Sequence, residues 1–180
     1  MKYVALLRGI NVGGKNMIKM AELRMSLEKV GFADVRTYIQ SGNILFSSDE
    51  IDSLGLAQKI EKHIEETYSC IVPTLVLNQP SLQAIVDNAP SGWGSDPKWK
   101  YNSLFLLPPY DREKVIASIG ILKPDIETIT PGEGVLYQSM SIELFGRTTT
   151  GKLAGVPIYQ RMTIRNWNTT RKLAELLRSR

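Results

Sequence analysis

A glycine-rich loop near the start of the chain carries the residues best suited to chemistry. The run Arg8–Lys15 holds a cation at each end, and its three glycines are Gly9, Gly13 and Gly14. It comes close to the phosphate loop GxxxxGK followed by Ser or Thr, in which backbone N–H groups surround phosphates and the last hydroxyl binds magnesium. Because Asn16 replaces that hydroxyl residue, the loop argues against a nucleotide hydrolase.

Two interpretations of this loop stay open. Its amides, together with Arg8 and Lys15, can form a nest that binds an anion. Alternatively, the glycines only supply the positive φ angles that turn the chain from a buried strand towards its crossover helix. The sequence alone does not choose between these two roles.

A second polar segment, Arg165–Lys172, lies near the end of the chain at a predicted strand-to-helix turn. Arg165 and Trp167 can stack on bases, and the N-terminus of a helix attracts phosphate. The alternative is structural: Asn166 and Asn168 cap the backbone, and Trp167 fills the gap between sheet and helix. If this segment meets the glycine loop in the fold, the two form one anion site.

Two other stretches could add to a site. Trp93 and Trp99 could form an aromatic platform for a ligand, although such residues more often fix a loop to the body of a protein. The run Gly146–Lys152 is rich in hydroxyl and amide groups. It suits an anion without specifying one.

The leading hypothesis is a non-enzymatic binding module for an anionic ligand: a nucleotide, a phosphorylated metabolite or a nucleic-acid backbone. Its candidate residues are Arg8, Gly9, Asn11, Gly13, Gly14, Lys15, Ser41, Asn43, Arg165, Asn166 and Trp167. The second hypothesis is an enzyme acting on a small phosphorylated or acidic metabolite, but no base is evident, so no catalytic residue is assigned. A protein-interaction scaffold is the third hypothesis.

Cysteine and histidine usage argues against a metal centre. The chain has one cysteine, Cys70, and one histidine, His63, so neither an internal disulfide nor a Cys/His metal cluster can form. Both residues occur in apolar patterns, which favours packing over catalysis. We expect no metal and no cofactor; the count does not address a site made of carboxylates alone.

Charge is unevenly placed along the chain. Residues 1–30 hold six Lys and Arg against two acids, and residues 161–180 hold six against one, whereas the middle holds ten against fifteen. If the two basic ends meet, they form a surface attractive to phosphates or acidic partners. Otherwise they are ordinary solvated surfaces.

The chain contains no apolar run of membrane-spanning length and no signal-peptide pattern at its N-terminus. We therefore expect a cytoplasmic protein that does not bind membranes. An anionic small molecule or nucleic acid is its possible partner, and the sequence identifies no protein partner.

Residues 1–78 are expected to form a ferredoxin-like half with element order βαββαβ, the split βαβ pattern. The predicted strands are Lys2–Leu7, Asp34–Gln40, Asn43–Ser47 and Cys70–Leu77. Pro73 predicts that the last of these lies at a sheet edge. Helical spacing of apolar residues predicts helices over 20–30 and 56–68. The pair Gly42–Asn43 predicts a hairpin, because both residues tolerate positive φ.

Residues 79–99 are expected to form a short helix near Ser81–Asn88 and a linker, and 100–180 a second ferredoxin-like half with a C-terminal helix. Asp111 is expected to cap the first helix of this half, and Asn168 the closing helix. No element is predicted for Arg147–Gln160. The predicted fold class is α+β, with mainly antiparallel sheets and helices packed on them. Whether the halves share one sheet is left open.

Three motifs resemble a bacterial family called domain of unknown function 1697. They are LLRGINVGG at Leu6–Gly14, TYIQSGN at Thr37–Asn43 and RNWNT at Arg165–Thr169. The resemblance extends over nearly the whole chain and implies a duplicated ferredoxin-like fold in a cytoplasmic bacterial protein. The family brings no established activity, so it implies no catalytic residue.

Overall fold

The computed structural model describes residues 1–14, 16–110, 112–155 and 157–179. Its contacts divide the chain into two compact units. The first unit comprises Met1–Gln83 and Leu173–Arg180, and the second comprises Ala84–Lys172. The sequence pattern assigned residues 173–180 to the second half, whereas their contacts group them with the first unit.

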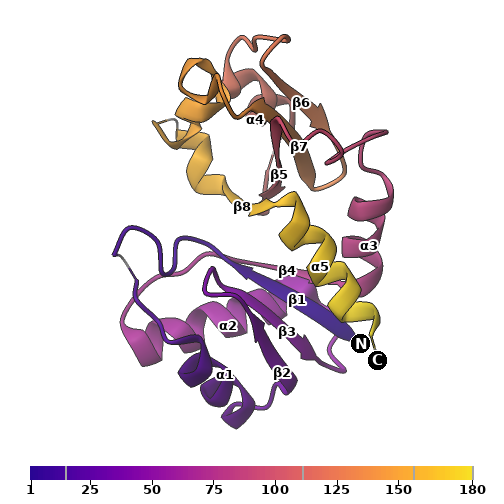
Figure 1. Cartoon of the computed structure of the whole chain (residues 1–180). Helices are drawn as coiled ribbons and strands as arrows, with labels where there is room; N and C mark the ends of the chain where they lie inside the picture. The colour runs from indigo at the N-terminus through magenta and orange to yellow at the C-terminus, as the bar shows by residue number, and fades with distance from the viewer. Residues whose placement is uncertain (15, 111, 156, 180) are drawn as a thin grey trace. The chain divides into compact units, whose positions relative to one another are not determined.

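The first unit contains a four-stranded antiparallel sheet with strand order β2-β3-β1-β4 (Figure 1). Its elements are β1 (Lys2–Leu7), α1 (Met20–Lys29), β2 (Ala33–Tyr38), β3 (Asn43–Ser47), α2 (Ser53–Tyr68) and β4 (Thr74–Asn78). This is the predicted βαββαβ order. The edge position of β4 is confirmed, but the strand begins after Pro73 and not at Cys70.

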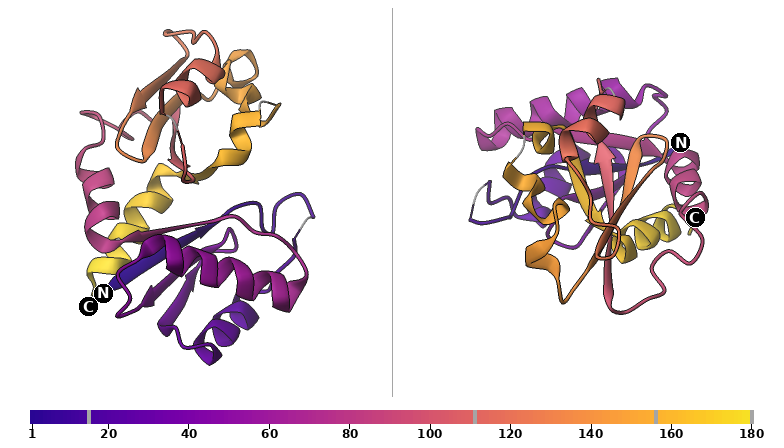
Figure 2. Two further views of the ribbon diagram at one scale, coloured as in Figure 1. Left: turned by 180° about the vertical axis from the view of Figure 1, so that it is seen from behind. Right: turned by 90° about the horizontal axis from the view of Figure 1, so that it is seen from above.

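One face of this sheet forms the core of the first unit with α1 and α2 (Figures 1 and 2). Tyr3, Ala5 and Leu7 of β1 belong to this core. Because side chains alternate across a strand, Val4 and Leu6 lie on the opposite face. The helices contribute Met20, Leu23, Leu27, Leu56, Ala57, Ile60 and Ile64. The helical spacing in the sequence therefore identified most of the buried stripe of each helix, whereas Val30, the last residue of the first predicted helix, is 53% exposed.

Local chemistry sets the ends of the two helices. At the start of α2, the Asp52 side chain accepts a hydrogen bond of 3.0 Å from the Leu54 amide, which satisfies one of the free N–H groups of a helix start. Beyond α1, Gly31 adopts a φ of 99°, a conformation that suits glycine at a helix end. Gly31 thus marks the end of α1.

The second unit has its own antiparallel sheet, with strand order β6-β7-β5-β8. Its strands are β5 (Trp99–Leu106), β6 (Glu127–Pro131), β7 (Val135–Ser141) and β8 (Met162–Asn166), and α4 (Arg112–Ile119) joins the first two. Two helices cross the boundary between the units along the chain: α3 (Gln79–Asp87) and α5 (Trp167–Arg178). The core packs α4 against the strands through Val115, Ile119, Leu104, Leu106, Leu136 and Met162.

Three short 3-10 helices occupy the stretch between β7 and β8; the sequence predicted no element for Arg147–Gln160, which makes up most of it. They are η1 (Phe145–Arg147), η2 (Thr150–Gly155) and η3 (Pro157–Arg161). Gly151, Gly155 and Pro157 disfavour a continuous α-helix here, since glycine adds backbone entropy and proline lacks an N–H donor. The second crossover of this unit is therefore irregular.

The predicted α+β class is confirmed, and the two halves have separate sheets. The cap predicted at Asp111 lies outside the described residues. Among the described helices, none is both long and apolar enough to cross a membrane.

Candidate functional site

Left-handed backbone shapes the glycine loop between β1 and α1. Five of its described residues have positive φ: Gly9 (71°), Asn11 (53°), Gly13 (60°), Gly14 (74°) and Asn16 (46°). A Cβ added at Gly9, Gly13 or Gly14 would meet nothing within 4 Å. Glycine is therefore favoured at these positions because it adopts positive φ easily, and not because a side chain would clash with a neighbour. The same open space leaves their backbone accessible, so anion binding by the loop stays a prediction.

Asn11 closes this loop through its side chain. Its Nδ2 donates to the carbonyl oxygens of Ile18 and Gln40, both at 2.9 Å, and its Oδ1 accepts from the Ile18 amide at 2.8 Å. Asn16 adds a longer bond of 3.3 Å from its Nδ2 to the Gly9 carbonyl. The amide groups of both asparagines thus hold the loop to itself and to the β2–β3 turn.

Of the two cations of the loop, Arg8 and Lys15, the structure describes Arg8. Arg8 is half-buried, and its backbone amide donates to the Pro73 carbonyl at 2.9 Å, which extends the pairing of β1 with β4. Lys15 lies outside the described residues. The ligand-binding roles assigned to both from the sequence stay predictions.

Ser41 and Asn43 belong to the turn between β2 and β3. Asn43 is fully buried, and its Nδ2 donates to the Tyr38 carbonyl at 3.0 Å and to Ser41 Oγ at 3.2 Å. Between them, a Cβ on Gly42 would lie 2.7 Å from the Leu7 Cβ, so only glycine allows this close approach to β1. The observed bonds of Asn43 stabilise the turn.

Arg165 lies on β8 and is buried, with 6% of its surface exposed. Its Nη1 donates to Thr163 Oγ1 and to the Ile164 carbonyl, both at 2.9 Å. Burial lowers the pKa of Arg165 to about 10, because removal from water disfavours the charged form. Direct contact of Arg165 with a ligand stays a prediction, and it requires a ligand group that is itself largely removed from water.

The closing helix α5 begins one residue after Asn166, which makes Asn166 the capping residue. Asn166 Oδ1 accepts from the Asn168 amide at 2.9 Å, and Asn166 Nδ2 donates to the Tyr101 carbonyl at 3.3 Å. The prediction that Asn168 caps this helix is therefore wrong. Both asparagines precede helical residues at suitable spacing, and the chain enters helical geometry at Trp167.

A cavity of about 400 Å³ opens at the N-terminus of α5. We call it the α5 cavity, and every residue that lines it belongs to the second unit. The lining residues are Gly94, Asp96, Pro97, Trp99, Lys100, Tyr101, Ile142, Asn166, Trp167 and Asn168. It therefore combines a helix N-terminus, one cation, one carboxylate and three aromatic side chains.

An aromatic cluster supports this cavity. Trp93 packs edge-on against Tyr101 and Tyr137, with ring centroids 4.9 and 5.8 Å apart, and Tyr137 packs against Trp167 at 6.4 Å. The Tyr137 hydroxyl donates to the Ile85 carbonyl at 2.7 Å. At Gly94, a Cβ would lie 2.6 Å from the Trp167 ring. The indole of Trp167 is thus fixed by its neighbours, as the structural alternative for this residue predicted.

The chain matches a known protein family. The family described as "Protein of unknown function (DUF1697)" matches residues 1–137. The chain belongs to this family. The matched residues include the first two of the three motifs noted in the sequence.

A solved structure resembles the chain over nearly its full length. It is described as the structure of the conserved bacterial protein SP0830 from Streptococcus pneumoniae, and it shares 35% sequence identity with this DUF1697 chain. The alignment covers 98% of each chain with a TM-score of 0.87. No match to the chain was found among curated proteins.

In this DUF1697 member, the predicted site residues fall into two groups. Arg8 to Gly14, Ser41 and Asn43 belong to the first unit, and Arg165, Asn166 and Trp167 to the second. Asn166 and Trp167 share the α5 cavity. That both groups converge on one ligand stays a prediction.

Lys100 and Tyr101 of the α5 cavity were absent from the predicted site, and Trp99 was noted only as a possible platform. Trp99 and Tyr101 share one face of β5 because they are two residues apart. That spacing was the available signal in the sequence. The spacing could not show that β5 pairs with β8 through Asn102 and Asn166. This pairing brings the two rings to the start of α5.

Two residues of the hydroxyl-rich run Gly146–Lys152, Thr149 and Thr150, donate hydrogen bonds to the carboxylate of Glu127. The buried carboxylate accepts hydrogen bonds from the amides of Thr149 and Thr150, both at 2.8 Å, and from Thr150 Oγ1 at 2.7 Å. The Lys123 amide adds a fourth at 3.1 Å. Glu127 thus fixes the first part of the irregular β7–β8 connection.

His63 and Cys70 are both partly buried residues of the first unit. Cys70 packs against the core as a partly buried side chain. His63 is also partly buried, and its Nε2 has no hydrogen-bond partner among the described residues. Within the described ranges, no three His, Cys, Asp or Glu side chains gather as a metal site would require.

Proposed function

We propose that the protein is a binding module for an anionic ligand and that the α5 cavity receives it. The observation that carries this proposal is the meeting of a helix N-terminus with the rings of Trp99 and Tyr101 in one cavity, which Lys100 also lines. The first N–H groups of a helix and its dipole favour an anion at this end. Lys100 is exposed, and its Nζ lies 5.8 Å from the centroid of the Phe145 ring, so it adds positive charge beside the cavity.

The aromatic side chains favour a ligand that joins its phosphate to a flat ring, as a nucleotide does. Trp99 and Tyr101 offer apolar surfaces on which a base can stack. The volume of about 400 Å³ falls within the range of small-molecule sites, roughly 300–1,000 Å³. The Asp96 carboxylate repels an anion on its side of the cavity. Its Oδ1 accepts a hydrogen bond of 2.8 Å from the Lys98 amide. We therefore propose that the phosphate binds at the helix end.

Calorimetric titration with adenosine monophosphate tests this proposal, with adenosine and inorganic phosphate as controls. Lys100→Ala should raise the Kd about tenfold, because one charge-assisted contact is lost. Trp99→Leu should also weaken binding, since the stacking surface shrinks. Lys98→Ala is the matched control, because Lys98 is an exposed neighbour that does not line the cavity. Equal Kd values for the Lys98 and Lys100 variants would contradict the proposal.

The glycine loop is a second candidate for the same anionic ligand. Its support is the run of positive-φ residues with open space over three glycines, because such backbone can direct N–H groups at an anion. Lys15→Ala should weaken binding if the loop holds the phosphate. If the unmutated protein shows no saturable binding of nucleotides or phosphorylated sugars, the anion-binding function fails at both places. The proposed location remains the cytoplasm, on the sequence argument alone.

A further inference from the structure

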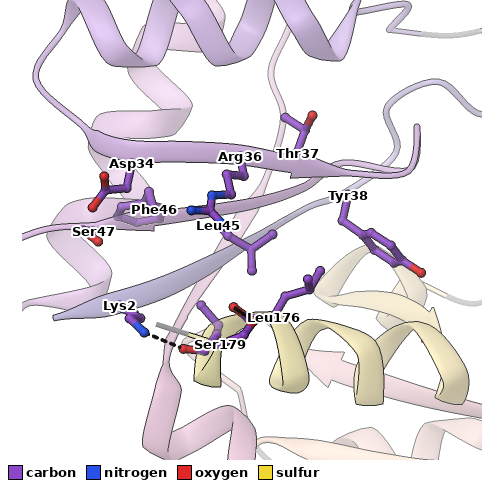
Figure 3. Close-up of a pocket in the computed structure, with 11 residues that line it drawn as sticks. Lys2, Asp34, Arg36, Thr37, Tyr38, Leu45, Phe46, Ser47, Leu176 and Ser179 are labelled. Carbon is purple, nitrogen blue, oxygen red and sulfur yellow. Dashed lines mark hydrogen bonds between the residues drawn. The ribbon is translucent and has the colours of Figure 1, made fainter.

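A second cavity, of about 310 Å³, lies in the first unit. We call it the Arg36 cavity. It lies between the sheet face opposite α1 and α2 and the last turn of α5, and Figure 3 shows Leu45 and Leu176 between Tyr38 and Lys2. None of the residues predicted from the sequence as ligand contacts lines it.

The register of the sheet explains why cations and apolar groups meet here. Arg36 and Tyr38 are two residues apart on β2, so both face away from the buried Val35. Arg36 lies opposite Leu45 of β3, and Lys2 of β1 lies opposite Ser47. Two basic side chains from different strands therefore flank the apolar surface of Leu45.

The charges of this cavity sum to a single positive charge. Arg36 is exposed, and within the described residues no ion pair or hydrogen bond engages its guanidinium. Lys2 Nζ donates to the Leu177 carbonyl at 3.1 Å, which uses one of the three donors of the ammonium group. Asp34 also lines the cavity and offsets one of the two cations. One monovalent anion matches this balance better than a phosphate dianion.

The walls between the charged groups are apolar. Leu45 is 6% exposed, and Leu176 and Tyr38 are half-buried. A ligand that fills this space needs an apolar body, and its charged group has to reach Arg36. The planar guanidinium suits a carboxylate, because its parallel N–H groups bind both carboxylate oxygens.

We propose that the Arg36 cavity binds a small carboxylic acid with an apolar body. The carboxylate pairs with Arg36 and receives support from Lys2, while the body packs between Leu45 and Leu176. This site does not depend on the α5 cavity, because it uses other residues, another ligand class and the first unit. Failure of either proposal leaves the other standing.

Calorimetric titration of the full chain with octanoate tests this inference. Octanamide keeps the size and apolar body but has no charge, and inorganic phosphate has charge without the body. We expect octanoate to bind with saturation and the two controls to bind at least about tenfold more weakly. Equal binding of octanoate and octanamide, stronger binding of phosphate, or no saturable binding of octanoate would each overturn the proposal.

Two substitutions in the cavity should act in opposite directions. Arg36→Gln removes the cation and should raise the Kd for octanoate about tenfold. Asp34→Asn removes the opposing charge and should lower the Kd; Asn tolerates the φ of 53° found at this position. Arg24→Gln is the matched control, since Arg24 is an exposed arginine of α1 that does not line the cavity. An unchanged Kd for Arg36→Gln would also overturn the proposal.

Discussion

Glu127 is a buried carboxylate whose hydrogen bonds hold the segment after β7. Glu127→Gln replaces one acceptor oxygen with an NH2 group, which then faces N–H donors. We expect a loss of about 2 kcal/mol in the free energy of unfolding, since bonds to charged groups contribute roughly 1.5–3 kcal/mol. Urea denaturation measures this loss in the free energy of unfolding. Glu133→Gln, at an exposed position of the β6–β7 turn, should change stability little, and a similar loss there would show that the four bonds are not the cause.

The same residue predicts a pH dependence. Burial by itself raises the pKa of Glu127, but hydrogen bonds from Thr150, Thr149 and Lys123 outweigh it and lower the pKa below its usual value. A group with a lowered folded pKa contributes stability that is complete above the unfolded pKa, about 4.3, and is lost as pH falls through the folded pKa. Urea midpoints should therefore separate wild type and Glu127→Gln at neutral pH and converge as the pH falls below the unfolded pKa and through the lowered folded pKa of Glu127. A gap that stays constant into acid would contradict this assignment.

Asn11 offers a test of whether the glycine loop depends on a side chain. Asn11→Gly keeps the left-handed backbone but removes three hydrogen bonds. We expect a loss of about 2–3 kcal/mol, at roughly 1 kcal/mol for each bond. Val12→Ala, at a residue 63% exposed, is the neighbouring control and should stay within about 0.5 kcal/mol of wild type. Thermal or urea unfolding by circular dichroism compares them.

The residue types in the sequence drew attention to the asparagines of the two loops, but they did not reveal whether these side chains bind a ligand or hold the backbone. Asn11 and Asn43 were predicted as ligand contacts, and both are found bonded to backbone carbonyls. The carbonyl that Asn11 reaches belongs to Gln40, 29 residues away along the chain. Local sequence shows a donor amide and not its distant acceptor, so a structural asparagine and a ligand-binding one look alike until the fold is known.

At the start of α5, the helix is capped by Asn166 and not by Asn168, the residue that the sequence predicted. Asn166→Ala removes the cap of the Asn168 amide and should cost about 1 kcal/mol. Asn168→Ala should cost less than about 0.5 kcal/mol, because an exposed residue within the first turn caps nothing. Urea unfolding of the two variants side by side gives the comparison. A larger loss for Asn168→Ala would restore the original prediction.

Elements with a strong local pattern were predictable, and those shaped by distant packing were not. The apolar runs Lys2–Leu7 and Asn43–Ser47 became strands with the predicted bounds. In the hairpin, Gly42 has the expected positive φ, but Asn43 already belongs to β3, and the second left-handed residue is Ile39 (52°). A β-branched residue is unfavourable there, but the side chains of Asn43 and Asn11 donate hydrogen bonds to the carbonyls of its neighbours Tyr38 and Gln40 and so hold the turn.

The uneven charge of the whole chain makes salt dependence informative. A mononucleotide in the α5 cavity presents one phosphate, whereas a nucleic acid bound along both basic ends would engage many. The logarithm of the binding constant falls with that of the salt concentration by about 0.7–0.9 for each phosphate engaged. Adenosine monophosphate has no condensed counterions to release, so we expect a much shallower slope for it, measured by calorimetry at several salt concentrations. A steep slope together with tighter binding of single-stranded nucleic acid would favour the polyanion version of the hypothesis.

The three tryptophans of the chain, Trp93, Trp99 and Trp167, all belong to the second unit. Trp99 and Trp167 line the α5 cavity, and none of the three lines the Arg36 cavity. Tryptophan emission is therefore an optical reporter that the chain already carries for one unit. A nucleotide that stacks on Trp99 should quench or shift this light, and a fluorimeter can follow its binding without any attached dye.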